Sequence, residues 1–477
     1  MPDLKDKVRN EGFCLLRLCK DLSEFIISGQ ARKTYLEETE HFLEYIKKSL
    51  KAVDKFVRQT VSKEIAPPLV NSKLREFDFI RKAISWLYIL VKEAIDADTL
   101  SIPYSLTILL NHIAKKLQKL EKVSIVILGS SNLMYYKCNL KHLRNLTRHL
   151  ESTVIKDYPV LPEDIGILKF PYCAAQEVLV NCILFHEMGH YIYENTNLEQ
   201  QFLNDIESNL TKFVQDKKII EELKPKDPDL ACNKLFIYVG GLMLSWADEI
   251  FADIFAIRVL GPAFYLACLE MEQILSTDIE RNRNFSRTHP ADDFRFKMHA
   301  KWLSKGKWDD TIRNRTPEIF DRLTVCKKLR LKNNYFSISC EPPLDGNKAI
   351  KEKLHKWMFK EFKKMVVKVE KEVLIKTASQ KPIDDFSKSD NLVTIALEHG
   401  VVPSTLYDRN KQKHHPSPTT ILNSGFFFYL GGMDRLLEKV ENNDSDVDKR
   451  INYEKRLNQW LAKAIEDWKI LLEEGKL

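Results

Sequence analysis

His186 and His190 are the residues whose type and spacing most clearly allow chemistry. Side chains four residues apart lie on one face of a helix, so these two imidazoles can share one metal ion. A catalytic zinc site needs neutral imidazole ligands, an open position for water, and a nearby base that takes the proton of this water. The segment His186-Glu187-Met188-Gly189-His190 therefore predicts two Zn²⁺ ligands, His186 and His190, and a general base, Glu187.

The sequence around this motif predicts a buried helix. From Ala174 to about Glu194 it contains no proline, and apolar residues cover a broad surface before the histidines. The alternative is a chance match on a helix whose histidines are merely packed. Gly189 favours a real site, because a glycine inside a helix costs about 1 kcal/mol relative to alanine and is better explained where another segment or a substrate comes close.

A tetrahedral site needs a further ligand, and the segment from Ser245 to Asp253 offers carboxylates. Glu249 and Asp253 are four residues apart and share a helix face, so Glu249 can bind the metal while Asp253 accepts the outer N–H of a ligating histidine. The segment is otherwise strongly apolar, and carboxylates buried in such surroundings need a partner. Asp248 is the alternative ligand, and an ordinary solvated acidic turn is the remaining alternative.

The two segments together resemble a known group of enzymes. His186-Glu187-x-x-His190 followed by Glu249-x-x-x-Asp253 is similar to the pattern of the gluzincins, the thermolysin-like metallopeptidases that bind zinc through two histidines and a glutamate. The resemblance covers about residues 160 to 300. It implies a zincin-like catalytic domain that hydrolyses peptide bonds of a protein or peptide substrate, with Zn²⁺ as cofactor.

Within this group the resemblance is split between two families. The helix Glu249-x-x-Ala252-x-x-Phe255-Ala256-x-x-Val259-Leu260-x-Pro262 looks like the corresponding helix of the ImmA/IrrE-type peptidases. The segment Thr288-His289-Pro290-Ala291-Asp292-Asp293-Phe294-Arg295 looks like the His-Pro-x-x-x-x-Arg element that follows the glutamate helix in the Ste24/HtpX-type peptidases.

His289 and Arg295 are further candidates for the site. A histidine held by the following Pro290 could stabilise the oxyanion that develops beside the metal, which would make His289 catalytic. Arg295 is expected to form a supporting ion pair, with Asp253 or with the glutamates of the site. The alternative for this segment is the first turn of a helix, with Thr288 as its cap.

The chain departs from both families in ways that suggest additional structure. Fifty-eight residues separate His190 from Glu249, more than an ImmA/IrrE-type enzyme is expected to have, so this insertion should contain a charged helix near residues 204–223. The longest apolar stretches, 235–247 and 426–430, are shorter than the roughly 20 residues that span a bilayer. No membrane anchor of the Ste24/HtpX kind is therefore expected.

The amino-acid composition limits the classes of protein to which this chain can belong. The 477 residues are 44% hydrophobic and 30% charged, which is typical of an ordered soluble protein large enough for two or three domains. The charged start of the chain lacks the apolar core of a secretory signal, and the nine scattered cysteines predict reduced thiols, so a cytoplasmic location is expected. A net charge of +7 permits an acidic partner without demanding one.

The pattern of elements predicts a predominantly helical α+β protein. We expect a helical domain at 1–120, the metallopeptidase domain at 121–305 with a small sheet, and a helical domain at 306–477 with a possible lid loop at 399–420. Strands are predicted at 123–129 and 165–170, and the second is either an edge strand that holds substrate or a core strand.

The functional expectation is a selective processing or regulatory peptidase, because the insertion 191–245 and the loop 399–420 could cover the site. A basic amphipathic helix at 351–376 could contact nucleic acid, but a solvated face over an apolar stripe explains it better, so nucleic acid is not an expected partner. The alternative function is a sensor or interaction protein that keeps the metallopeptidase fold without turnover.

Overall fold

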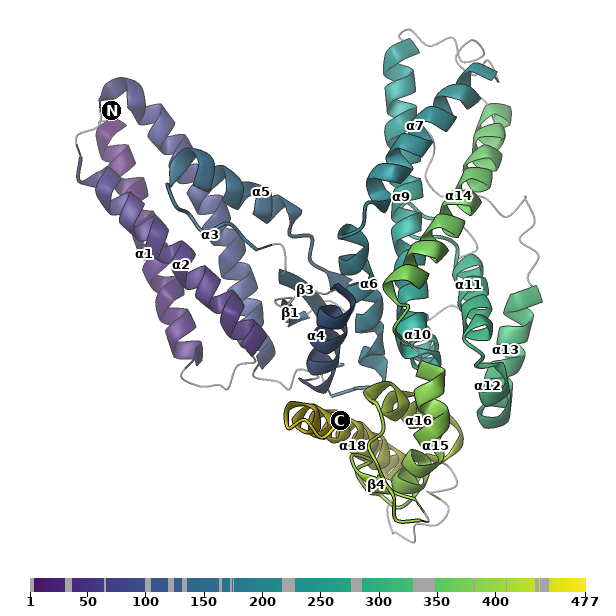
Figure 1. Ribbon diagram of the computed structural model, residues 1–477. Coiled ribbons are helices and arrows are strands. Elements are labelled where there is room, and N and C mark those ends of the chain that lie inside the picture. The colour runs from purple at the N-terminus through teal and green to yellow at the C-terminus, as the bar shows by residue number, and fades with distance from the viewer. Residues whose placement is uncertain are drawn as a thin grey trace. The chain divides into compact units, whose positions relative to one another are not determined.

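The computed structural model of the chain describes residues 4–30, 37–63, 66–98, 104–118, 124–130, 135–162, 165–171, 174, 176–216, 228–275, 285–328, 348–380, 382–408, 410–433, 437 and 446–477. By their internal contacts these residues form two compact units, unit 1 (1–176) and unit 2 (177–477) (Figure 1). Compact units defined by contacts need not be independently folding domains, so the three-domain division expected from the sequence stays a prediction.

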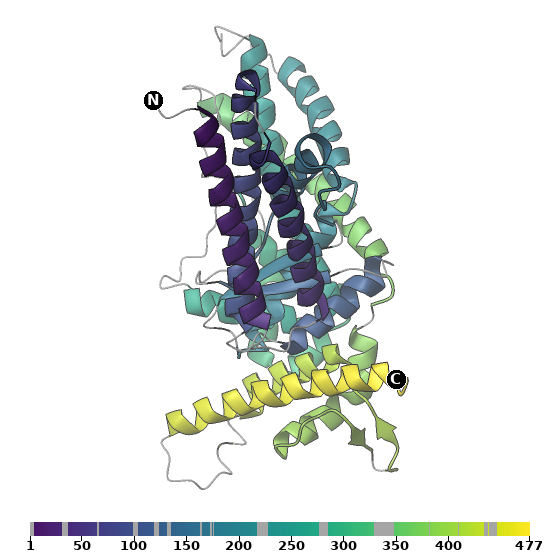
Figure 2. The same ribbon diagram turned by 90° about the vertical axis from the view of Figure 1, so that its left-hand side faces the viewer.

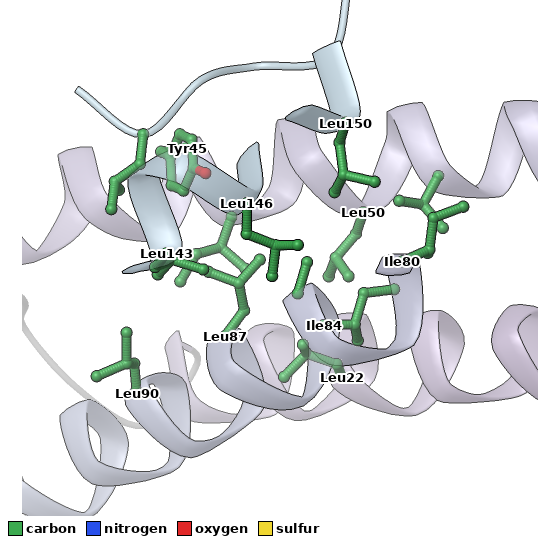
Figure 3. Close-up of a cluster of buried hydrophobic side chains, with 14 of the residues drawn as sticks. Leu22, Tyr45, Leu50, Ile80, Ile84, Leu87, Leu90, Leu143, Leu146 and Leu150 are labelled. Atoms are coloured by element: carbon green, nitrogen blue, oxygen red, sulfur yellow. The ribbon is translucent and has the colours of Figure 1, made fainter. Parts of the chain in front are cut away.

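Unit 1 is built mainly from long helices with an apolar stripe. The helices are α1 (Leu4–Gln30), α2 (Glu37–Val61), the 3₁₀ turn η1 (Pro67–Leu69), α3 (Val70–Asp98), α4 (Tyr104–Gln118), α5 (Lys141–His149) and the π-helical turn η2 (Leu150–Val154). Three of them, α1, α2 and α3, pack together in both views (Figures 1 and 2). Their buried leucines and isoleucines meet those of α5 in one cluster, in which Leu22, Leu50, Ile84 and Leu146 face one another (Figure 3).

Unit 1 also holds the small sheet, whose strands are β1 (Ser124–Ser130), β2 (Tyr136–Lys137) and β3 (Ile165–Pro171) in the order β1-β3-β2. β1 and β3 are parallel with Ile125 opposite Gly166, and β2 is antiparallel to β3. Both strands expected from the sequence are therefore confirmed.

The expectation that residues 165–170 form an edge strand for substrate is wrong. β3 lies between β1 and β2, it is buried along its whole length, and its Ile167 carbonyl accepts a hydrogen bond from Cys138 N. Because the ladder groups of Leu168 and Lys169 face strands on both sides, they are not free to pair with a peptide. The alternative of a core strand is the one that the structure supports.

Unit 2 carries the motif residues and is almost entirely helical. Its elements are the 3₁₀ turn η4 (Val180–Ile183), α6 (Leu184–Glu194), α7 (Leu198–Asp216), α9 (Pro228–Leu260), α10 (Pro262–Leu275), α11 (Asp292–Lys305), α12 (Asp309–Arg315), α13 (Pro317–Lys328), α14 (Lys348–Lys376), α15 (Pro382–Glu398), the strands β4 (Leu406–Tyr407) and β5 (Lys413–His414), α16 (Pro418–Gly431) and α18 (Asp446–Glu473).

The 33-residue helix α9 is the centre of unit 2. It packs against α6, α7, α10, α11, α14 and α16 (Figure 1), and its residues from Trp246 to Leu260 are almost all buried. A helix that is apolar all round is expected where other helices surround it. The two acidic residues in its most buried part, Glu249 and Asp253, therefore need partners inside the unit.

The turn after α9 is fixed by a glycine and an asparagine. Gly261 has φ +74°, in the left-handed region that favours glycine, and Pro262 starts α10. The buried side chain of Asn423 in α16 accepts a hydrogen bond from Ala263 N (2.8 Å) and donates one to Leu260 O (2.6 Å). These bonds satisfy backbone groups that the interrupted helix leaves without partners, so α16 holds the end of α9 in place.

Two segments expected to cover the site have defined local structure. The insertion contains α7 (Leu198–Asp216), as the charged sequence predicted, while residues 217–227 lie outside the described part of the chain. The loop 399–420 includes the antiparallel pair β4–β5 and the start of α16, and β4 packs on α15 through the buried Leu406. Its role as a lid stays a prediction.

Among the described helices, one is long and apolar enough to cross a membrane by length and composition, the segment Cys232–Leu260 of α9. This helix was not identified from the sequence as a possible span, because only uninterrupted apolar stretches were considered and Asp248, Glu249 and Asp253 interrupt this one. Most of this helix is buried within unit 2, and the core helix of a protein outside membranes has the same composition. The predominantly helical α+β class with a small mixed sheet is confirmed, and the zincin-like fold and the cytoplasmic location stay predictions.

Candidate metal centre

The centre forms where α6 crosses α9 at very short range. A Cβ added to Gly189 of α6 would lie 2.6 Å from the Cα of Ala252 in α9 and 3.1 Å from its carbonyl oxygen. Only a residue without a side chain permits this approach. Gly189 thus serves the role that its sequence position suggested, and the approach brings the histidines of α6 against the carboxylates of α9.

Three side chains place donor atoms around one point. His186 Nε2 lies 3.0 Å from His190 Nε2 and 3.4 Å from Glu249 Oε2, and His190 Nε2 lies 3.5 Å from Glu249 Oε1. Tetrahedral ligands with bonds of about 2.0–2.1 Å are separated by about 3.3–3.4 Å. The observed separations bracket this value, so the geometry fits a small tetrahedrally bound cation.

Glu187 belongs to the same group. One carboxylate oxygen of Glu187 and one ring nitrogen each of His186 and His190 all lie within 4.8 Å of one another, and Glu187 is buried. This His-Glu-x-x-His group could bind a metal ion. Its carboxylate is close enough either to coordinate such an ion or to accept a proton from a molecule bound to it.

Carboxylates also hold the outer nitrogens of both histidines. His186 Nδ1 lies 2.9 Å from Asp253 Oδ1, and His190 Nδ1 lies 2.7 Å from Asp248 Oδ1. A carboxylate at Nδ1 favours the tautomer that carries its proton there, which leaves Nε2 unprotonated and directed at the centre. Asp248, predicted as the alternative ligand, therefore lies at the outer side of His190.

Asp253 is the hub of a buried network. It is fully buried and receives two hydrogen bonds from the guanidinium of Arg295, of 2.8 Å from Nε and 2.7 Å from Nη2. His299 Nε2 also lies 3.0 Å from the Oδ2 atom of Asp253. Burial alone would raise the pKa of Asp253, but the charges of Arg295 and His299, the hydrogen bonds from Arg295 and the adjacent ring of His186 hold it well below its usual range.

The expected ion pair of Arg295 with Asp253 thus forms, and Arg295 Nη2 also lies 3.4 Å from Glu249 Oε2. His299 was missed in the sequence. Its only signal is a spacing of four residues from Arg295, which places both on one face of α11. That spacing is common in helices, so tertiary packing was needed to assign His299 to the network.

Burial and the neighbouring charges shift the pKa values of His186 and Glu249 in opposite directions. Burial favours neutral His186, but the adjacent carboxylates of Asp253 and Glu249 outweigh this and raise its pKa to about 10. The pKa of Glu249 is lowered: burial alone would raise it, while Arg295 and the two histidines have the larger effect. Glu249 Oε2 is also buried and receives no hydrogen bond from the described residues. A cation at the centre would satisfy this oxygen.

The formal charge of the centre also suits a divalent cation. Four carboxylates, those of Glu187, Asp248, Glu249 and Asp253, surround the histidines, and Arg295 supplies one positive charge. With neutral histidines the cluster therefore carries a formal charge of −3. Two positive charges at its centre would remove most of this excess.

His289 reaches the centre from the loop before α11. Its Nε2 lies 3.4 Å from Glu249 Oε1, its Nδ1 lies 2.7 Å from Thr288 Oγ1, and about half of its side chain is exposed. The expected helix cap is displaced, because α11 begins at Asp292 and Thr288 contacts His289. His289 is thus the one described donor of the cluster with substantial access to solvent.

Comparisons of the chain with models of protein families, with curated proteins and with solved structures found no match. The assignment of a function therefore depends on the geometry of the centre.

Proposed function

We propose that unit 2 is a zinc-dependent peptidase, in which His186, His190 and Glu249 hold the metal. The observation that carries this proposal is the set of separations of 3.0–3.5 Å between the three donor groups, with Glu187 beside them. Two imidazoles, one carboxylate and a tetrahedral arrangement are the donor set of catalytic zinc sites. The resemblance to gluzincins is consistent with the same three ligands.

When bound, the metal supplies Lewis acidity, which lowers the pKa of a coordinated water to about 7. Glu187 then accepts the proton of the attacking water and transfers it to the leaving amine of the peptide. His289, partly exposed at the edge of the centre, donates a hydrogen bond to the oxyanion of the substrate. Asp253 and Asp248 keep His186 and His190 in the required tautomer, and Arg295 holds Asp253.

The decisive experiment compares two identical substitutions in α6. Glu187→Gln removes the proton acceptor but keeps its volume, whereas Glu194→Gln changes an exposed residue at the end of the same helix. We expect both purified variants to retain one zinc ion and the fold. Only wild type and Glu194→Gln should generate new protein termini when expressed in cells, as mapped by terminomics. Full turnover by Glu187→Gln would refute the assignment of Glu187.

One observation favours the alternative of a metal-bound regulator without turnover. His289 Nε2 is as close to Glu249 as the two histidines of α6, so it could serve as a fourth protein ligand. A site closed by four protein ligands has no position for water and is typical of structural zinc.

The effect of His289→Ala distinguishes a peptidase from a metal-bound regulator. In a peptidase it should lower the turnover rate with little change in zinc affinity, because an oxyanion donor acts on the substrate. In a closed structural site it should weaken zinc binding, and no peptide should be cleaved by wild type.

A further inference from the structure

Unit 2 contains a second candidate binding site on the other face of α11. Arg295 and His299 on this helix contact Asp253 of the metal centre, whereas Lys297 and Lys301 line a cavity of about 600 Å³ between α11, α13 and α14. A volume of this size is within the range of sites for small ligands. No residue that we assign to the metal centre lines this cavity.

The floor of the cavity is apolar and its rim is basic. Phe294 and Met298 of α11 and Val366 of α14 form buried parts of the lining. Lys297, Lys301, Lys327 and Lys363 also line it, against a single glutamate, Glu370, so the formal charge of the lining is +3.

Two of the lining lysines, Lys301 and Lys327, are paired with acidic side chains. Glu370 is shared, because it pairs with Lys301 and lies 3.4 Å from Lys305. Lys327 pairs with Asp309 at 2.8 Å. Lys363 lies over the ring of Phe359, 3.9 Å from its centroid, which is a cation–π contact and not an ion pair. Among the described residues Lys363 therefore contacts an aromatic ring and forms no ion pair, and its positive charge lies beside an apolar floor.

From this combination we propose that the cavity binds a small anionic amphiphile, a molecule with a phosphate or carboxylate head and an apolar tail. The lysines would bind the head by charge-assisted hydrogen bonds, and the tail would cover Phe294, Met298 and Val366. An uncharged amphiphile would leave Lys363 without an anionic partner, and a free anion would leave the apolar floor exposed to water. The proposal does not rest on the proposed peptidase activity.

The test is calorimetric titration of the full-length protein with octyl phosphate below its micelle concentration. Inorganic phosphate carries the charge of the head without a tail, and octyl glucoside carries the tail without a charge. Both should bind far more weakly than octyl phosphate. Equal affinity for inorganic phosphate would show that the floor contributes nothing, and equal affinity for octyl glucoside would show that the lysines contribute nothing. Either result, or no binding of octyl phosphate, would overturn the proposal.

A pair of charge reversals in α14 locates the site. Lys363→Glu changes a lining residue, and Lys371→Glu changes an exposed lysine of the same helix outside the cavity. Both lysines are exposed, so neither change is expected to affect folding. We expect Lys363→Glu to weaken octyl phosphate binding by roughly tenfold or more and Lys371→Glu to leave it nearly unchanged. Equal effects of the two substitutions would place the binding elsewhere.

Co-sedimentation with vesicles that contain an anionic phospholipid distinguishes the source of the ligand. Binding that octyl phosphate displaces would identify a membrane lipid as the source, and octyl phosphate binding without vesicle binding would identify a free amphiphile. Vesicle binding that octyl phosphate does not displace, and that Lys363→Glu does not weaken, would assign the basic surface to membrane contact and overturn the cavity as the site.

Discussion

Replacing Gly189 with alanine tests whether the close crossing of α6 and α9 builds the metal centre. The new Cβ would lie 2.6 Å from the Cα of Ala252, whereas ordinary contacts begin at 3.4 Å, so the helices would have to separate by about 0.8 Å. The contact is with backbone, which no side-chain rotation can relieve. Overpacking of this kind costs about 1–3 kcal/mol, and the better helix propensity of alanine returns about 1 kcal/mol.

We therefore expect Gly189→Ala to lower the free energy of unfolding of the metal-free protein by up to about 2 kcal/mol. Glu249 lies one turn before Ala252, so the same separation should move it away from His186 and His190, which are now 3.4 and 3.5 Å from it. Metal sites tolerate displacements of only about 0.2 Å, so zinc affinity should fall by roughly tenfold or more.

The matched control is Gly241→Ala in α9. A Cβ there meets nothing within 4 Å, so only the propensity effect remains and stability should rise by about 1 kcal/mol. Both quantities are measurable, by urea unfolding in the presence of a chelator and by competition with a zinc-binding dye. If Gly189→Ala is as stable as Gly241→Ala and binds zinc like wild type, the reasoning about the crossing is refuted.

Two further predictions concern the charges around the histidines. Asp253→Asn removes the buried anion that receives both guanidinium bonds of the half-buried Arg295 and leaves only Glu249 among the described residues, 3.4 Å away, so unfolding free energy should fall by about 3–5 kcal/mol and zinc affinity by about 10–100-fold. Asp248→Asn, at a carboxylate 30% exposed, should mainly lower zinc affinity, and equal stability losses would contradict the buried network. Because the pKa of His186 is raised from 6.5 to about 10, its contribution to the stability of metal-free protein should be full below pH 6.5 and lost as pH rises toward 10. Zinc requires neutral imidazole, so its affinity should rise over the same window, and denaturation and zinc titrations at several pH values would show whether the two trends are opposite.

The sequence was most informative where chemistry depends on local spacing. His186, Glu187 and His190 are within five residues of one helix, and Glu249 and Asp253 are one turn apart, so helix periodicity alone predicted which side chains share a face. The helical class and both strands were predictable for the same reason, because apolar periodicity is a local signal.

Tertiary structure decided which of these faces meet. The sequence left Asp248 and Glu249 as alternative ligands, and only the close approach of α6 to α9 places Glu249 beside both Nε2 atoms and Asp248 beside His190 Nδ1. It also decided that β3 lies inside its sheet, since strand order depends on distant segments. His299 belongs to the network because one face of α11 packs against Asp253, and the basic cavity forms because another face of α11 lines it together with α14. Such relations depend on packing between residues far apart in the chain, for which helix and strand periodicity carries no signal.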